Sequence, residues 1–589
     1  MKHTITALMR FFNKKEKKRL LLLLFMMVFA ALFETLGIGL IVPFIGIVTN
    51  PEMILENRGL HVVYQFLHFQ STTAFTVFAV VCLLLVFLLK NLYLMLFNYV
   101  QLRIILNQQV KLSRELFKAY LIKPYTFHLQ RNSAELLRNV NQEVPNVFQG
   151  IIMSSFQLFT ELLVIACIMI LLLIVSPVAT LTASVLLGGS VVVFFTILRK
   201  KISALGKEQQ RVSGAMIQWV NQGLGASKEV KVSGKERFFI QAYTSQNQVR
   251  ANNSRYMKML ELVPRLFIET LLVSIVLITM LIIVFQGTST SELISTMALF
   301  AMAAFRLMPS ITRVVALITT IRYSQPSLAV VYADLFHHDR EEPINKQPTI
   351  INSRDKAYRD AIRLQHVHFR YPGQMAYAVN DISLTIPIGQ SVAFIGESGA
   401  GKTTLVDTIL GLFQPEKGAI TIDGIDLQEQ LPKWRQKIGY IPQSIFLSDD
   451  TIRGNVAFGI NRDEIDDQEV WRALEQAQLK TFIKELPDQL DTEVGEQGVR
   501  LSGGQRQRIG IARALYHNPE ILFMDEATSA LDHETEKEIM QAIDSLKGEK
   551  TFIIIAHRLT TIENCDLVFT IHNGRLVNRK EGGAKQSVM

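Results

Sequence analysis

The chain has 589 residues, 49% of them hydrophobic, and a formal net charge of +9. This length is too great for a single hydrophobic core, so several domains are expected. A basic chain could bind nucleic acid, but the Lys and Arg residues here cluster beside long apolar runs, as in membrane proteins, so no nucleic-acid partner is expected. The three cysteines show neither a pairing pattern nor metal-ligand spacing, and we interpret them as small apolar side chains.

Residues 1–330 are predicted to form an α-helical transmembrane domain with six spans. The basic segment 1–19 leads into an apolar run that is too long for a signal peptide and has no evident cleavage site. Runs long enough to cross a bilayer lie at Leu20–Val48, Phe75–Phe97, Ile151–Val175, Val178–Leu198, Leu266–Phe285 and Leu293–Thr319. The long segments 98–150 and 199–264 are rich in Lys and Arg. The positive-inside rule therefore predicts a multi-pass membrane protein with both chain ends in the cytoplasm.

The loop between the first two spans contains a predicted amphipathic helix at Leu60–Gln70. His61, Gln65 and His68 recur on one side of it, and apolar residues occupy the other. Such a helix can lie at the outer membrane interface, or it can pack as a cap on the ends of the spans. Both interpretations remain open.

Four charged residues fall within the predicted spans, namely Glu34, Glu161, Glu269 and Arg306. A charge at this depth usually faces a helix bundle or a cavity, because exposure to lipid is costly. In one interpretation Arg306 contacts an anionic group of a substrate such as a lipid phosphate, and Glu34 is a second candidate for contact with the substrate. In the other, which we favour, Arg306 pairs with one of the glutamates and holds helices together.

Residues 331–360 are polar and contain Pro343 and Pro348, so we predict a linker there. Further along, the apolar, strand-like stretch Ser391–Ile395 is followed by a glycine-rich loop and then by apolar residues at helical spacing. This is the context that a phosphate-binding P-loop requires. The loop supplies the predicted nucleotide-binding residues Gly396, Glu397, Ser398, Gly399, Ala400, Gly401, Lys402, Thr403 and Thr404. Lys402 is expected to contact the β- and γ-phosphates, and the Thr403 hydroxyl is expected to bind Mg²⁺.

Two further motifs follow the P-loop. Residues 501–505 read LSGGQ, and residues 521–532 read ILFMDEATSALD, an apolar strand ending in two acids. In this order the three motifs resemble those of the ATP-binding cassette (ABC) ATPases, over about residues 360–575. The resemblance implies an α/β P-loop ATPase domain at 361–580 with a tail at 581–589. Six spans followed by such a domain resemble an ABC exporter half-transporter.

The resemblance also implies roles for single residues. Tyr371 corresponds to an aromatic residue that stacks on adenine. Gln443 corresponds to a catalytic residue whose amide can reach Mg²⁺ or the attacking water, and Asp525 corresponds to a residue that holds Mg²⁺. Glu526 corresponds to the general base, and His557 to a histidine that contacts the γ-phosphate. Residues Ser502, Gly503, Gly504 and Gln505 of the signature motif are expected to bind the ATP held by a second chain, with Asp532 near the same interface. A working unit therefore needs two cassettes, expected to come from a homodimer, with a heterodimer as the alternative.

Two helical breaks, at Lys123–Tyr125 and at Gly223–Glu236, lie where the family has coupling helices that dock on the ATPase domain. A weaker resemblance, carried by Glu34–Ile45, Phe305–Arg313 and the external helix, is to the lipid-linked oligosaccharide flippases. The predicted function is an ATP- and Mg²⁺-dependent exporter or flippase that moves an amphipathic, lipid-linked saccharide by alternating access, with membrane lipid as a partner. The alternatives are drug or peptide export and, in another class, an ATP-gated channel or regulator.

Overall fold

The computed structural model describes residues 11–40, 58–69, 71–175, 177–285, 290–336, 357–525, 545–556 and 565–581, together with five single residues (44, 47, 54, 537 and 562). The chain divides into two compact units. The first contains residues 1–121 and 131–342, and the second contains residues 122–130 and 343–589. The short segment 122–130 thus belongs to the second unit although the first surrounds it in sequence.

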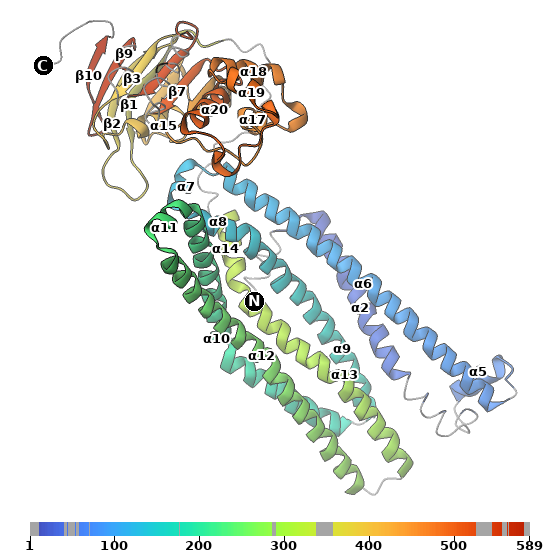
Figure 1. The fold of residues 1–589 in the computed structure, drawn as a ribbon. Helices are drawn as coiled ribbons and strands as arrows, with labels where there is room; N and C mark the ends of the chain where they lie inside the picture. The colour runs from blue at the N-terminus through green and yellow to red at the C-terminus, as the bar shows by residue number, and fades with distance from the viewer. Residues whose placement is uncertain are drawn as a thin grey trace. The chain divides into compact units, whose positions relative to one another are not determined.

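The first unit is helical (Figure 1). Its elements are α2 (Lys14–Gly39), α5 (Arg58–Phe66), α6 (Thr72–Ile122), α8 (Ser133–Arg138), the π-helical η1 (Asn139–Glu143) and η2 (Asn146–Met153), α9 (Ser154–Val175), α10 (Pro177–Gly225), α11 (Ser227–Ser233), α12 (Glu236–Phe285), α13 (Thr290–Tyr323) and α14 (Gln325–Phe336). Helices α6, α10 and α12 have 51, 49 and 50 residues. At about 1.5 Å per residue each is about 75 Å long, more than twice the apolar thickness of a bilayer. The Lys- and Arg-rich segments are therefore continuations of the spans.

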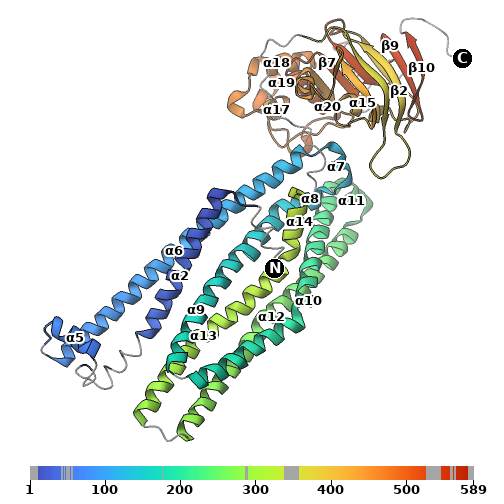
Figure 2. The ribbon, with the colours of Figure 1, turned by 180° about the vertical axis from the view of Figure 1, so that it is seen from behind.

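The six predicted spans overlap α2, α6, α9, α10, α12 and α13, which run roughly parallel to one another in both views (Figures 1 and 2). The first was predicted to reach Val48, but α2 ends at Gly39 and most of 41–48 lies outside the described residues. Among the described residues, four segments are long and apolar enough to cross a membrane, at Lys14–Gly37, Thr72–Ile122, Ser133–Ile174 and Leu307–Phe336. Side chains on α6 such as Leu84 and Leu88 are more than 60% exposed. Because water would not tolerate so many exposed leucines, this surface fits a lipid environment.

One apolar cluster joins five of these helices. Ala31 of α2, Ile168 of α9, Phe195 of α10, Ile268 of α12 and Val315 of α13 are all buried in it. Two of the helices carry a proline in their interior, Pro264 in α12 and Pro309 in α13. In contrast, α6 contains neither glycine nor proline.

The predicted external helix is present but shorter than expected. Helix α5 ends at Phe66, and His68 has a φ of +53°, so the chain turns before Gln70 and the prediction was wrong at this end. The Tyr64 ring packs against Phe75 of α6, with centroids 5.6 Å apart. Val62 and Phe66 are 64% and 79% exposed. The helix therefore caps a span with one side and presents apolar side chains on another.

A buried polar network lies at the end of α6. Tyr120 Oη donates to Asp334 Oδ2 of α14 over 2.5 Å, and Asn139 Nδ2 of η1 donates to the same oxygen over 2.9 Å. Beside it, Arg138 forms a buried ion pair with Glu143 over 3.3 Å. The network joins the end of α6 to the end of α14. The chain passes from the first unit to the second at or shortly after each of these helix ends, so the network holds the two connections close together.

One of the charged residues of the spans has a partner in the described part of the chain. Arg313 of α13 donates to both carboxylate oxygens of Glu161 on α9, over 2.5 and 3.2 Å. Glu161 thus forms an ion pair with Arg313, a partner that the sequence analysis did not consider. Glu34 is half-buried on α2. The backbone of Arg306 lies in α13, and its side chain lies outside the described residues.

The Glu161–Arg313 pair leads to a prediction about assembly. Glu161→Gln leaves the guanidinium without its charge partner, so the temperature of thermal unfolding in detergent should fall. The double variant with Arg313→Gln should recover part of that loss, because neither charge then remains unpaired. The control is Glu208→Gln, which breaks the exposed pair between Glu208 and Arg211 on one helix and should change little. Equal shifts for Glu161→Gln and Glu208→Gln would contradict a stabilising role for the α9–α13 pair.

The second unit is an α/β domain. Its strands are β1 (Ala361–Phe369), β2 (Val379–Pro387), β3 (Ser391–Ile395), β4 (Lys417–Ile422), β5 (Ile425–Asp426), β6 (Ile438–Ile441), β7 (Ile521–Asp525), β8 (Thr551–Ile555), β9 (Leu567–His572) and β10 (Arg575–Glu581). Its helices are α7 (Tyr125–Gln130), α15 (Lys402–Ile409), α16 (Leu431–Lys437), α17 (Ile452–Val456), α18 (Asp467–Gln476), α19 (Lys480–Glu485) and α20 (Gly503–Leu515), with short 3-10 turns η3 to η5.

Two sheets organise this unit. An antiparallel sheet has the order β2-β1-β4-β5, and a six-stranded sheet has the order β10-β9-β3-β8-β7-β6, parallel except for the edge strand β10. Strands β7 and β8 are buried along their whole length, which explains their uninterrupted apolar sequences. In a parallel sheet the carboxyl ends of neighbouring strands meet at one edge. The P-loop after β3 and Asp525 at the end of β7 therefore share an edge.

Candidate functional site

The P-loop connects β3 to α15 and requires glycine at two close approaches. Gly396 has a φ of +150°, and a Cβ there would lie 2.2 Å from the carbonyl oxygen of Ile571. Gly401 has a φ of +98°, and a Cβ there would lie 2.3 Å from the carbonyl oxygen of Ala378. Neither position admits a side chain without a shift of the backbone. The loop therefore closes tightly enough for its N–H groups to point at one anion.

Lys402 begins α15 and is buried, with 5% of its surface exposed. Its Nζ donates to the carbonyl oxygens of Gly396 and Glu397, each over 2.9 Å. The ammonium group therefore lies inside the curve of the loop, where it can contact a phosphate. The next residue, Thr403, is exposed.

A cavity of about 440 Å³ adjoins the loop and joins it to the predicted aromatic residue. Its lining consists of Tyr371, Gln374, Ala376, Tyr377, Ala378, Ser398, Gly399, Gly401, Lys402, Thr403 and Thr404. The Tyr371 hydroxyl and Thr404 Oγ1 are 2.9 Å apart and share a hydrogen bond. An aromatic ring and a phosphate-binding loop thus face one space, as a nucleotide with a base and phosphates requires.

A half-buried carboxylate on the helix that follows the P-loop was missed at the sequence level. Asp407 lies on α15, and burial, with a further contribution from the negative charge of Asp525, raises its pKa from 3.8 to about 7. Burial and these two carboxylates also raise the pKa of Tyr440 on β6. The signal in the sequence is the single acid among the apolar residues that follow the P-loop.

The raised pKa of Asp407 leads to a prediction about pH. The folded state binds this proton more tightly than the unfolded chain does, so the carboxyl group destabilises the fold as pH rises from about 4 and reaches its full effect above pH 7. Asp407→Asn should therefore be more stable than the parent, and its advantage should grow by about 1 kcal/mol between pH 6 and pH 8. Thermal unfolding in EDTA without nucleotide measures this. An advantage that is independent of pH would contradict the assignment.

The signature motif begins α20. Ser502 is the N-cap, its Oγ accepts from the Gln505 backbone N–H over 3.2 Å, and Gln505 Oε1 accepts from the Ser502 N–H over 2.8 Å. This reciprocal capping fixes the helix start and leaves Ser502 and Gly503 exposed. Among the described residues, the lining of the P-loop cavity includes none of the four signature residues. In the described part of the chain, the signature motif thus lies outside the cavity at the P-loop.

The other predicted site residues are described unevenly. Gln443 follows β6 and is exposed, and Asp525 is buried at the end of β7. Glu526, His557 and Asp532 lie outside the described residues. In the part of the chain that the structure describes, no group of three or more His, Cys, Asp or Glu could hold a metal by itself. The oxygen donors Thr403, Gln443 and Asp525 are the kind that Mg²⁺ accepts when substrate phosphates complete its coordination.

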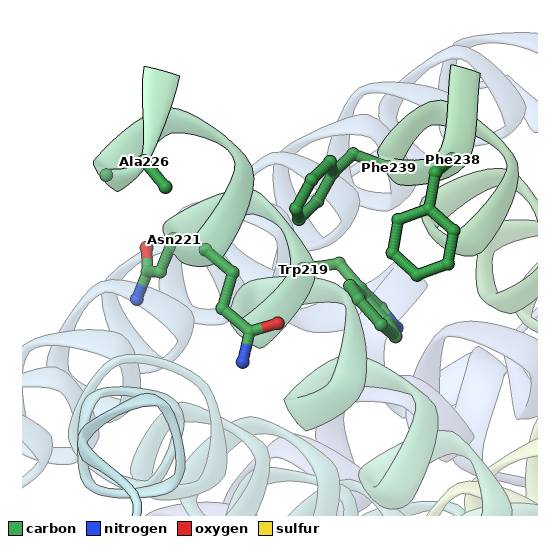
Figure 3. A pocket seen from close by; sticks show the side chains of 7 residues that line it. Trp219, Asn221, Ala226, Phe238 and Phe239 are labelled. Atoms are coloured by element: carbon green, nitrogen blue, oxygen red, sulfur yellow. The ribbon is translucent and has the colours of Figure 1, made fainter. Parts of the chain in front are cut away.

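Each predicted helical break contains a short helix. Helix α7 belongs to the second unit, and its Tyr125 ring lies 5.9 Å from the ring of Phe413. Helix α11 belongs to the first unit and ends at Gly234, which has a φ of +60°. Beside α11 a cavity of about 510 Å³ is lined by Trp219, Phe238 and Phe239 together with Asn221, Gln222, Gly225 and Ala226 (Figure 3). The positions of both short helices agree with the sequence prediction.

The comparisons with known proteins cover both units. The family model for the ABC transporter transmembrane region matches residues 20–308, and the ABC transporter model matches residues 379–529. An ATP-dependent lipid A-core flippase of Saccharophagus degradans is 33% identical over 82% of this chain and 80% of its own length. The mitochondrial ATP-binding cassette sub-family B member 10 of Mus musculus is 44% identical over 38% of this chain and 32% of its own length.

A solved structure of a bacterial Atm1-family ABC exporter with ATP bound superposes with a TM-score of 0.78, at 24% identity, over 97% of this chain and 96% of that one. This likeness confirms the predicted fold, a helical transmembrane region followed by an ABC ATPase domain. The family matches and the similarity along most of the chain show that the protein belongs to the ABC transporter family, with its membrane region and its ATP-hydrolysing domain in one polypeptide.

Proposed function

We propose that the protein is an ATP-driven flippase that moves an amphipathic lipid with a saccharide headgroup between the leaflets of a bacterial inner membrane. The observation that carries this proposal is the 33% identity to a lipid A-core flippase along four-fifths of both chains, because it includes the membrane helices as well as the cassette. We propose that the N-terminus and the cassette are cytoplasmic, as the Lys- and Arg-rich helix extensions require.

The chemistry follows from the residues around the P-loop. The loop N–H groups and Lys402 bind the phosphates, and Tyr371 stacks on the base. Thr403, Gln443 and Asp525 hold Mg²⁺, which neutralises charge that develops on the phosphates. Glu526 orients the attacking water and accepts its proton, and His557 contacts the γ-phosphate. All these roles require positioning and charge stabilisation, with no covalent intermediate on the protein.

The working unit in this proposal is a dimer. The exposed N-terminus of α20 offers N–H groups and a positive helix end, which suit a phosphate held by another chain. Two-fold symmetry places Ser502, Gly503, Gly504 and Gln505 of each chain over the P-loop of the other. ATP then drives transport because it binds more tightly to the state in which the cassettes are closed. A homodimer satisfies this, and a heterodimer is the alternative.

ATP hydrolysis and lipid translocation by the protein in lipid nanodiscs and vesicles test the proposal. Lipid A-core glycolipid, polyprenyl-pyrophosphate glycolipid, ordinary phospholipid and cationic drugs are titrated in parallel. Stimulation by a glycolipid, with its transfer between leaflets, supports the flippase. Stimulation by drugs alone favours drug export, and ATP-gated ion conductance without transfer favours a channel.

The same assay tests whether Arg306 contacts the substrate. Arg306→Gln should abolish stimulation by an anionic glycolipid and leave basal ATP hydrolysis, whereas Arg306→Lys should retain part of the stimulation. Arg313→Gln is the control, because that arginine is paired with Glu161. Loss of assembly in Arg306→Gln would support a structural role for Arg306 instead.

A further inference from the structure

The starting point is a buried aromatic residue that the ATPase motifs do not include. Phe413 is 1% exposed and lies after α15, the helix that begins at the P-loop. The chain reaches it through Gly411, which has a φ of +75° and admits no Cβ, because that atom would lie 2.4 Å from Leu431 Cδ1. The position of Phe413 is therefore fixed with respect to the helix that carries Lys402.

On one side, Phe413 packs against the aromatic residues of the nucleotide cavity. Its ring stacks on Phe369 with centroids 4.6 Å apart and an interplanar angle of 11°. It meets Tyr371 edge-to-face, with centroids 5.6 Å apart at 82°. Phe369 also contacts Tyr371, with centroids 5.3 Å apart. The rings of Phe369 and Phe413 thus set the orientation of Tyr371, and close packing leaves the three rings little freedom to move separately.

On its other side, Phe413 meets the helix at the first predicted break. The Tyr125 ring of α7 lies 5.9 Å from the Phe413 ring, at an interplanar angle of 31°. Tyr125 is 42% exposed, so Phe413 supports it from one side only. Both residues lie within the second unit. A continuous row of rings, Tyr125–Phe413–Tyr371, therefore runs from α7 to the nucleotide cavity.

We propose that Phe413 is a positioning residue for Tyr371, and that Tyr125 of α7 acts through it on the affinity of the site for the base of ATP. The inference rests on the proposed function, in which Tyr371 contacts the base. Displacement of Tyr125 shifts the Phe413 ring, and the edge-to-face contact transmits this shift to Tyr371. The phosphate contacts of the P-loop are made by backbone N–H groups and Lys402. They therefore respond less to a displacement of Tyr125 than the contact of Tyr371 with the base does. A movement of α7 therefore changes the affinity of the site for the base of ATP.

The test compares a ligand that has a base with one that lacks it. Affinities for ATP and for inorganic tripolyphosphate are measured with Mg²⁺ on the full-length protein in nanodiscs, in a Glu526→Gln background that prevents hydrolysis. Tyr125→Ala should weaken ATP binding about two- to tenfold, the range expected for one aromatic contact, and should leave tripolyphosphate binding unchanged. Tyr125→Phe should behave like the parent. Leu129→Ala, at another exposed position on α7, is the matched control and should have no effect.

The remaining outcomes decide against the inference in different ways. Equal weakening of ATP and tripolyphosphate by Tyr125→Ala overturns it, because the effect then acts through the phosphates or the fold. No effect of Tyr125→Ala, with weaker ATP binding in Tyr371→Ala, overturns the role of α7 and leaves the proposed function intact. Unchanged ATP binding in Tyr371→Ala would show that Tyr371 does not contact the base. Both the inference and this part of the proposed site would then be wrong. Phe413→Leu should also weaken ATP binding and leave tripolyphosphate binding unchanged, as Tyr125→Ala does. If Phe413→Leu weakened tripolyphosphate binding more than ATP binding, this would contradict a role of Phe413 in positioning Tyr371.

Discussion

Replacing Glu526 with glutamine should lower ATP hydrolysis by about two to four orders of magnitude, the usual contribution of a positioned general base. Glutamine has nearly the same shape but cannot accept the proton of the attacking water. ATP binding should survive, because the P-loop, Lys402 and Tyr371 are unchanged. The variant should therefore accumulate in the ATP-bound, closed dimer. Steady-state hydrolysis and retention of labelled ATP after gel filtration measure the two effects.

The control for Glu526→Gln is Glu475→Gln, an exposed residue of α18 that pairs with Lys480. This variant should hydrolyse ATP at the parent rate, since it removes only a surface ion pair. Normal turnover by Glu526→Gln would exclude this residue as the base. Loss of both binding and hydrolysis would instead indicate damage to the fold of the cassette.

Replacing Gly401 with alanine should nearly abolish ATP binding. The added Cβ lies 2.3 Å from the carbonyl oxygen of Ala378, so either the P-loop or the start of β2 must move. Gly399→Ala is the matched control, because its φ of +82° is also positive but a Cβ there has no neighbour within 4 Å. A positive φ alone costs alanine about 1–2 kcal/mol, which corresponds to a loss of affinity of about tenfold or somewhat more.

The difference in ATP affinity between the two glycine variants measures the effect of the clash with the Ala378 carbonyl oxygen. We expect Gly401→Ala to bind ATP at least about tenfold more weakly than Gly399→Ala, as a backbone clash adds to the dihedral strain. Equilibrium binding of a fluorescent ATP analogue measures both, and circular dichroism verifies that each variant is folded. Equal affinities would contradict the close approach to Ala378.

The sequence was sufficient to predict those features in which backbone geometry or burial restricts the residue types. The P-loop needs glycines at fixed places, a buried parallel strand needs an uninterrupted apolar run, and a membrane helix needs a long one. These requirements predicted β3, β7, α15 and the long apolar helices of the first unit. Tyr371 came from resemblance, because a tyrosine before a proline is ordinary turn chemistry by itself.

The features that were missed depend on contacts between residues far apart in the sequence. The ion pair between Glu161 and Arg313 was not predicted, because the two residues lie on helices far apart in the sequence and their spacing gives no sign of the contact. Asp407 looked like a polar position on a helix, and only the fold brings it near Asp525. The contact between Tyr125 and Phe413 spans almost 300 residues, and neither ring belongs to a known ATPase motif. Helix α5 ended early because His68 adopts a left-handed backbone that no pattern in the sequence required.

The prolines of the membrane helices divide the bundle into stiff and flexible rods. A rod such as α6, without glycine or proline, transmits a tilt along its full length, so that a tilt of about 10° at one end displaces the other by about 13 Å. Helices α12 and α13 each lose a backbone hydrogen bond at Pro264 and Pro309, which makes those points the natural hinges. When one end of the bundle moves, α6 then tilts as a rigid helix, whereas α12 and α13 bend at their prolines. The bending of α12 and α13 would then determine to which leaflet the bundle opens. The rigid α6 would carry the displacement from one end of the bundle to the other.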